Sequence, residues 1–164
     1  MTAAATFTSI FREEHREVRD LLFDLIAAFQ ARDTGRARSL LTQIAGRTGP
    51  HFRYEEESLY PELVDVFGAD YVDKLLSDHD GAVRTARRLM ELAGKDTLSD
   101  AEVAEAVDGA RSILPHVSDC DGLSIMVERF PEARIEHILQ TRQRALAADV
   151  DLLTWAGTIR QRPA

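Results

Sequence analysis

Hydrophobic positions recur every three or four residues along five segments of this chain, which is the spacing of one face of an α-helix. In the first segment, about residues 7–32, this face carries Phe11, His15, Val18, Leu22, Leu25 and Phe29. In the second, about residues 35–60, it carries Leu41, Ile44, Thr48, His51, Glu55 and Leu59. The spacing predicts two amphipathic helices, separated by the turn-forming sequence Asp33-Thr34-Gly35.

Two further helices are predicted in the middle of the chain. The face of residues 69–93 carries Val72, Leu75, His79, Val83, Ala86 and Met90, and Gly94 follows as a helix stop. The next helix opens at Ser99-Asp100-Ala101-Glu102, which is typical of a capping box, and its face carries Ala106, Ala110, Ile113, His116, Cys120, Leu123 and Val127. Four helices with short connections predict an all-α, up-down-up-down four-helix bundle over about residues 7–130.

A fifth helical segment, about residues 131–158, follows Pro131, and its face carries Ile135, Leu139, Arg142, Leu146, Val150 and Leu153. This face carries no candidate metal ligand, and His137 lies off it as an exposed residue. We interpret the segment as an additional C-terminal helix that covers the bundle, or as an edge through which the chain forms a homodimer. A length of 164 residues suits one domain, residues 1–164.

Composition narrows the possible partners. The chain has 28 acidic and 20 basic residues, a net charge of −8, so we expect no nucleic-acid partner. No apolar run approaches the length of a membrane span, so we expect no membrane association. The first residues show no basic segment followed by an apolar block, and there is one cysteine. We therefore expect a cytoplasmic protein without an internal disulfide.

Four of the five histidines lie on the apolar faces, one in each helix of the predicted bundle: His15, His51, His79 and His116. Glu55 follows His51 by four residues, about 40° further around the helix, so both side chains point towards the core. Burying an ionised carboxylate is costly unless it is paired or binds a metal. The pattern predicts a pair of metal ions, and imidazole with carboxylate suits iron, manganese or zinc.

Two families of metal-binding bundles can be compared with this pattern. A ferritin-like bundle uses Glu-x-x-His motifs, and no histidine here has a glutamate three residues before it. The chain instead resembles the hemerythrin family, including the HHE cation-binding domains, over about residues 7–130. The resemblance rests on His15 in FREEHREV, His51 and Glu55 in HFRYEEESLYP, His79 in SDHDGAV, and His116 and Asp121 in HVSDCDG.

The resemblance implies a non-heme di-iron centre inside the bundle. It implies two bridging carboxylates and two histidines for each of the two iron ions. The bridges would be Glu55 and Asp121, one iron would bind His15 and His51, and the other would bind His79 and His116.

Asp121 needs an explanation, because five residues after His116 it lies 140° around a regular helix. A π-bulge would rotate it inward, and Gly122 would ease the distortion. Cys120, four residues after His116, lies closer to the inward face, and Asp119 is a further alternative. Because the family pattern has the same offset, we assign Asp121 as the ligand and Cys120 as a core residue or a neighbour of the ligands.

The chain departs from the family pattern on the third helix. Where hemerythrins have the second histidine of His-x3-His, this chain has Val83, which cannot bind a metal. One iron would therefore lack a protein ligand, unless Tyr54, three residues after His51, fills the position. The alternative for Tyr54 is an aromatic side chain packed in the core.

These features favour a di-iron protein that binds, senses or reduces a small ligand: oxygen, nitric oxide or hydrogen peroxide. The alternative is an iron-handling or iron-sensing module whose fold depends on metal occupancy, because metal-binding energy then becomes folding energy. A purely structural metal is a third possibility, against which the missing ligand at Val83 argues. The sequence leaves open whether the protein is an enzyme that turns over peroxide or nitric oxide.

Overall fold

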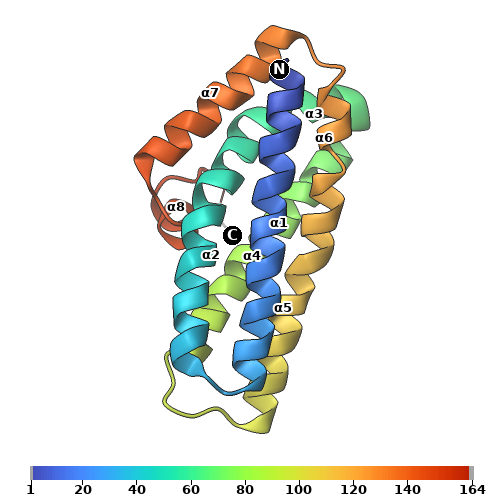
Figure 1. Cartoon of the computed structure of the whole chain (residues 1–164). Coiled ribbons are helices and arrows are strands. Elements are labelled where there is room, and N and C mark those ends of the chain that lie inside the picture. Colours follow the sequence, from blue (N-terminus) through green and yellow to red (C-terminus); the bar gives the residue numbers. More distant parts are fainter. Residues whose placement is uncertain (1, 163–164) are drawn as a thin grey trace.

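The computed structural model describes residues 2–162, and within this range it contains helices and turns but no strand. Four long helices run side by side: α1 (Ala3–Gln30), α2 (Thr34–Tyr54), α4 (Ala69–Ala93) and α5 (Asp100–Asp121). Figure 1 shows that both short connections, α1 to α2 and α4 to α5, lie at the same end. Each long helix contacts two others, α1 and α4 both packing against α2 and α5. The predicted up-down-up-down bundle is confirmed.

The helices begin where side chains satisfy the free N–H groups of a first turn. The hydroxyl of Thr2 and the carboxylate of Asp33 accept backbone N–H groups at the starts of α1 and α2. The predicted capping box of α5 is present, since Ser99 and Glu102 each accept a hydrogen bond from the backbone of the other. Local sequence therefore sets these three boundaries.

The predicted second helix continues beyond Tyr54 with a change of register. A π-helical turn, η1 (Glu55–Leu59), leads into α3 (Tyr60–Phe67). The N–H of Tyr60 donates to the carbonyl of Glu55, five residues back, and the following Pro61 has no N–H to donate. The wider turn absorbs one additional residue, so side chains five apart come to the same face of the helix.

The π turn that we predicted between His116 and Asp121 is absent. Helix α5 is α-helical through Asp121, and the chain then continues through a turn into the short α6 (Ser124–Val127). That prediction is wrong in its position, because the distortion lies on the second bundle helix and follows His51.

The expected C-terminal helix consists of two helices, α7 (Glu132–Ala148) and α8 (Leu152–Thr158). Between them Asp149 adopts a left-handed conformation with φ of 47°, and Asp151 caps α8. Helix α7 packs on α1, α2 and η1, and α8 packs on α2 and α4. The segment thus covers the bundle, as one of our two interpretations held, whereas formation of a homodimer stays a prediction.

The buried face of α7 differs from the predicted one. Leu146, which we placed on that face, is 44% exposed. The face that packs on the bundle carries Ile135, Ile138, Thr141 and Ala145. The two faces share Ile135 and then diverge, because the segment has apolar residues on both sides and periodicity alone does not choose between them.

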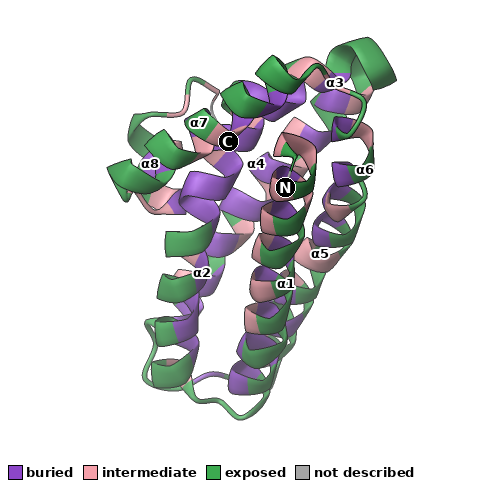
Figure 2. Ribbon diagram, turned by 45° about the horizontal axis from the view of Figure 1, so that its top comes forward, coloured by how far each residue is buried: buried purple, intermediate pink, exposed green. Residues whose placement is uncertain are grey.

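Two apolar clusters of the core lie at the two ends of the bundle. One contains Leu22 and Leu25 near the α1–α2 connection, and the other contains Phe7, Phe11 and Tyr60 near α6 and α7. Figure 2 shows buried positions along the inward faces and exposed positions outside. In sequence, His15, His51 and His79 fall between residues of the two clusters, and His116 lies beside Val117 of the first cluster, so the four buried histidines form a polar layer across the bundle.

The turn between α7 and α8 packs directly against α2 at Gly49. A Cβ atom added there would lie 2.3 Å from the carbonyl oxygen of Val150 and 2.6 Å from the carbonyl carbon of Asp151. Backbone atoms cannot yield as a flexible side chain can, so the C-terminal segment would have to move away from α2.

We therefore expect Gly49→Ala to lower the free energy of unfolding by about 2 kcal/mol, a typical cost of overpacking. Gly46→Ala, three residues earlier, is the control, because Gly46 is exposed and a Cβ added there would have no atom within 4 Å. It should instead stabilise the helix by about 0.5–1 kcal/mol. Denaturant unfolding measures both changes, and a stabilising effect of Gly49→Ala would contradict the close approach.

Candidate metal centre

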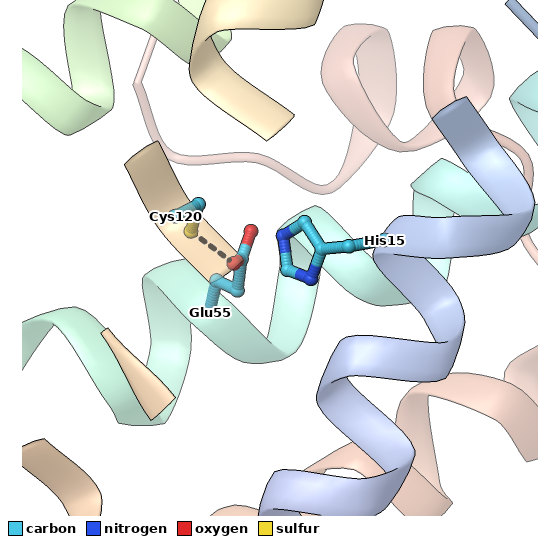
Figure 3. Close-up of side chains that lie close together, drawn as sticks. All are labelled: His15, Glu55 and Cys120. Carbon is cyan, nitrogen blue, oxygen red and sulfur yellow. Dashed lines mark hydrogen bonds between the residues drawn. The ribbon is translucent and has the colours of Figure 1, made fainter. Parts of the chain in front are cut away.

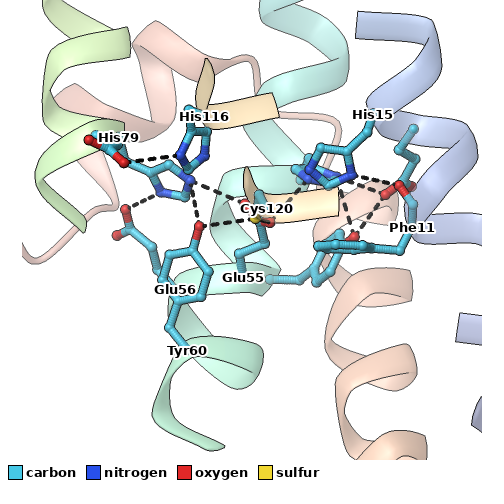
Figure 4. Close-up of polar contacts among 12 residues, drawn as sticks. Phe11, His15, Glu55, Glu56, Tyr60, His79, His116 and Cys120 are labelled. Atoms are coloured by element: carbon cyan, nitrogen blue, oxygen red, sulfur yellow. Dashed lines mark hydrogen bonds and ion pairs between the residues drawn. The ribbon is translucent and has the colours of Figure 1, made fainter. Parts of the chain in front are cut away.

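The four histidines predicted from the apolar faces are buried and meet in one layer, of which Figure 4 labels His15, His79 and His116. His15 comes from α1, His51 from α2, His79 from α4 and His116 from α5. They form two pairs, with ring centroids 4.6 Å apart for His15 and His51 and 4.9 Å apart for His79 and His116. The grouping is the one that the family resemblance implied for two metal ions.

Glu55 lies between the two histidine pairs and is 0% exposed. Its Oε1 is 3.3 Å from Nε2 of His51, and its Oε2 is 3.2 Å from Nε2 of His79. Oε2 has no hydrogen-bond partner, although an unpaired buried carboxylate oxygen is costly. One carboxylate thus presents an oxygen to each pair, an arrangement suited to a bridge between two cations.

The outward ring nitrogens of the histidines face hydrogen-bond acceptors. Three Nδ1 atoms donate: His15 to the carbonyl of Phe11 (2.7 Å), His51 to Glu14 (2.8 Å) and His79 to Glu56 (2.8 Å). The fourth, Nδ1 of His116, has no hydrogen-bond partner and lies 3.6 Å from a carboxylate oxygen of Asp78. Because the three bound acceptors cannot donate, the ring proton of His15, His51 and His79 belongs on Nδ1, which leaves Nε2 available to a metal.

Within each pair, the pKa of one histidine is lowered and the pKa of the other is raised. Burial, together with the neighbouring His51, lowers the pKa of His15 to about 4, and burial beside His79 does the same for His116. Burial alone would also lower the pKa of His51, but the carboxylates of Glu55 and Glu14 outweigh it and raise the pKa to about 10.

The pKa of His79 is raised in the same way, because the neighbouring carboxylates of Glu55 and Glu56 outweigh its burial. Each pair therefore combines a ring whose pKa is lowered with a ring whose pKa is raised, on either side of the Glu55 carboxylate. Metal ions and protons compete for the ring nitrogens, so metal binding depends on pH.

Helix α5 presents Cys120 to the layer. The thiol donates to Oε1 of Glu55 at 2.9 Å (Figure 3), and donor atoms of His15, Glu55 and Cys120 lie within 4.8 Å of one another. A second such group consists of Glu55, His79 and His116. Glu55 belongs to both groups, which again describes two adjacent metal positions.

Asp121 lies at the margin of this layer. One carboxylate oxygen is 3.6 Å from Nε of Arg12, and the other is buried without a hydrogen-bond partner. Asp119, the weaker alternative, is exposed and lies 3.8 Å from Lys74. The inner oxygen of Asp121 is thus a donor atom still lacking a partner, while Cys120 is the α5 residue in direct contact with Glu55.

Tyr60 is a residue of the centre that the sequence did not reveal. Its buried hydroxyl lies 3.0 Å from Nε2 of His79 and 3.6 Å from Sγ of Cys120. The tyrosine that we selected, Tyr54, donates its hydroxyl to Glu14 at 2.8 Å, and this hydroxyl lies 3.3 Å from Nδ1, the outer ring nitrogen of His51.

Val83 occupies an apolar environment. It is fully buried in a cluster that includes Phe52 of α2 and Leu152 and Trp155 of α8. The ring of Phe52 also stacks on His79, with centroids 3.7 Å apart and planes 5° apart. The position of the second family histidine is therefore filled by packed hydrophobic side chains.

Comparison with known proteins agrees with this geometry. Residues 6–147 match the family described as the hemerythrin HHE cation binding domain. The match spans most of the chain, and the chain belongs to this family, in which cation binding is the shared property. No curated protein and no solved structure matched the chain. Residues of α8 lie outside the matched range.

Two other expectations concern the remainder of the chain. His137 is exposed on α7, as predicted from its place off the apolar face. Across residues 2–162, no helix combines the length and the apolar character that crossing a membrane requires.

Glu55→Gln should weaken metal binding at both positions, because one carboxylate serves both histidine pairs. We expect the metal affinity to fall by more than about 100-fold. Loss of a residue that only hydrogen-bonds to a metal ligand already lowers the affinity by about 10–100-fold. Glu57→Gln is the matched control, because Glu57 is exposed and pairs with Arg53 at 2.9 Å. Calorimetric titration with zinc measures both variants; retention of wild-type affinity by Glu55→Gln would rule out the bridging position.

Proposed function

We propose that this protein is a non-heme di-iron protein that binds, senses or reduces a small ligand: oxygen, nitric oxide or hydrogen peroxide. The observation that carries the proposal is the position of Glu55, buried between two histidine pairs with one oxygen towards each. Two iron ions held there would supply redox chemistry at adjacent positions. The free, buried cysteine is consistent with the proposed cytoplasmic location.

The proposed ligands are those that the family resemblance implied. His15 and His51 would hold one iron, His79 and His116 the other, and Glu55 would bridge them. For the second bridge we retain Asp121, because its inner oxygen is buried and lacks a partner. Cys120 is the competing donor, since its thiol already contacts Glu55.

A small cavity beside the histidines supports a small ligand. It has a volume of about 40 Å³ and is lined by His15, His51 and His116 together with apolar side chains such as Leu22 and Ile44. This volume accommodates one water or a diatomic molecule. Apolar walls limit the entry of bulk water, so the residues around the centre favour oxygen, nitric oxide or peroxide over a large organic substrate.

Tyr60 gives the centre a proton donor. Its hydroxyl is buried and lies next to Nε2 of His79, on the inward side of the layer. Reduction of peroxide consumes protons, and a positioned donor contributes about 10²–10⁴-fold to a rate. In the proposed function, Tyr60 supplies that proton from within the site.

Tyr60→Phe should therefore slow peroxide consumption by about 100-fold at equal iron content. Tyr71→Phe is the control, since the ring of Tyr71 packs on Phe67 with centroids 4.7 Å apart, eight residues before His79 on α4, and loss of its hydroxyl should leave the rate close to wild type. Stopped-flow measurement of peroxide loss, with the optical spectrum of each iron-loaded variant, provides the test. Equal rates in the two variants would exclude Tyr60 as the donor.

An iron-sensing module is the second candidate. It is favoured by the buried charges of the layer, since Glu55 without a cation retains an unpaired oxygen in the core. In that case removal of the metal should unfold the bundle cooperatively. Circular dichroism of the metal-free protein at growth temperature distinguishes the candidates, because a ligand-binding centre requires only local rearrangement.

A further inference from the structure

Two arginines of the C-terminal segment contact carboxylates that bind histidines of the layer. Arg142 of α7 contacts Glu14, which accepts the Nδ1–H of His51. Arg160, two residues after α8, contacts Glu56, which accepts the Nδ1–H of His79. Each histidine pair is thus connected through one carboxylate to one arginine, on opposite sides of Glu55.

The geometry of both contacts is specific. Nε of Arg142 lies 2.7 Å from Oε1 of Glu14, while His51 binds Oε2 of the same carboxylate. Arg160 uses Nη2 and Nε for the two oxygens of Glu56, at 2.7 and 3.0 Å. A two-point contact of this kind fixes the plane of a carboxylate as well as its position.

Arg160 is the more deeply enclosed of the two. Its side chain is 1% exposed, its third nitrogen lies 2.8 Å from Asp80, and its guanidinium lies over the ring of Trp155 at 5.4 Å. A buried ion pair usually contributes no more to stability than apolar residues of the same volume. Stability of the bundle alone therefore does not explain a cation in this place.

We propose that Arg142 and Arg160 are positioning residues that fix the rings of His51 and His79 through Glu14 and Glu56. The inference rests on the proposed function, because it assigns these rings to two metal positions. The C-terminal segment thereby acts on the centre without supplying a ligand. Arg160 does so from outside the part of the chain that matches the family, residues 6–147.

The chain offers a matched control for each arginine. Arg162 has the same charge and lies two residues after Arg160, but it contacts Asp80 and no carboxylate that binds a histidine. Arg144 lies two residues after Arg142, is exposed and donates to the hydroxyl of Thr141. Each control variant removes one positive charge from the same segment as its partner.

The test compares the Nδ1–H signals of His51 and His79 in the NMR spectrum of the metal-free, full-length protein. Arg160→Gln should speed the exchange of the His79 signal with water by about tenfold or more, because the carboxylate that holds it is released. The His51 signal should not change. Arg142→Gln should do the reverse, and Arg162→Gln and Arg144→Gln should affect neither signal.

Zinc titration of the same variants adds a second readout. Arg142→Gln and Arg160→Gln should each lower the zinc affinity of one of the two metal positions by about tenfold. This is the low end of the range observed when a residue that supports a metal ligand is lost. Unchanged histidine signals in both variants, with only a lower melting temperature, would overturn the inference. Wild-type protein that binds no metal would instead contradict the proposed function, while the histidine signals still report whether the arginines hold the rings.

Discussion

The structure depends on one costly feature, a carboxylate without an exposed atom in the middle of a helical bundle. The two oxygens of Glu55 lie 3.3 and 3.2 Å from inward nitrogens of His51 and His79, and Oε2 has no hydrogen-bond partner, so the carboxylate needs a cation beside it. Those rings are held in turn by Glu14 and Glu56 behind them, and these carboxylates by Arg142 and Arg160. Charges alternate outward from Glu55 to the C-terminal helices, so the cover of the bundle and the centre of the bundle belong to one network.

The bundle and the histidine layer were predictable from the sequence because both depend on helical periodicity. A polar residue on an apolar face is conspicuous, and His15, His51, His79 and His116 each interrupt such a face. The capping box at Ser99 and the stop at Gly94 were predictable for the same reason, since they depend on local chemistry. Positions fixed by regular geometry within one helix were therefore found correctly.

Positions that depend on irregular backbone or on distant contacts were not predictable. Tyr60 reaches the layer because a π turn follows Tyr54, whereas we expected such a turn beside Asp121. The arginine contacts join residues 128 and 104 positions apart, which no local spacing encodes. The chosen face of α7 was wrong beyond Ile135 because that helix is apolar on more than one side. Each failure marks a place where tertiary packing overrides the local pattern.

The central claim, that Glu55 joins two metal positions, is tested most directly by anaerobic titration of the metal-free protein with iron(II), followed by Mössbauer spectroscopy after oxidation. We expect two iron ions per chain and two ferric ions that are magnetically coupled, because coupling requires a ligand shared between them. Binding of a single iron ion, or of two ions without coupling, would contradict the claim.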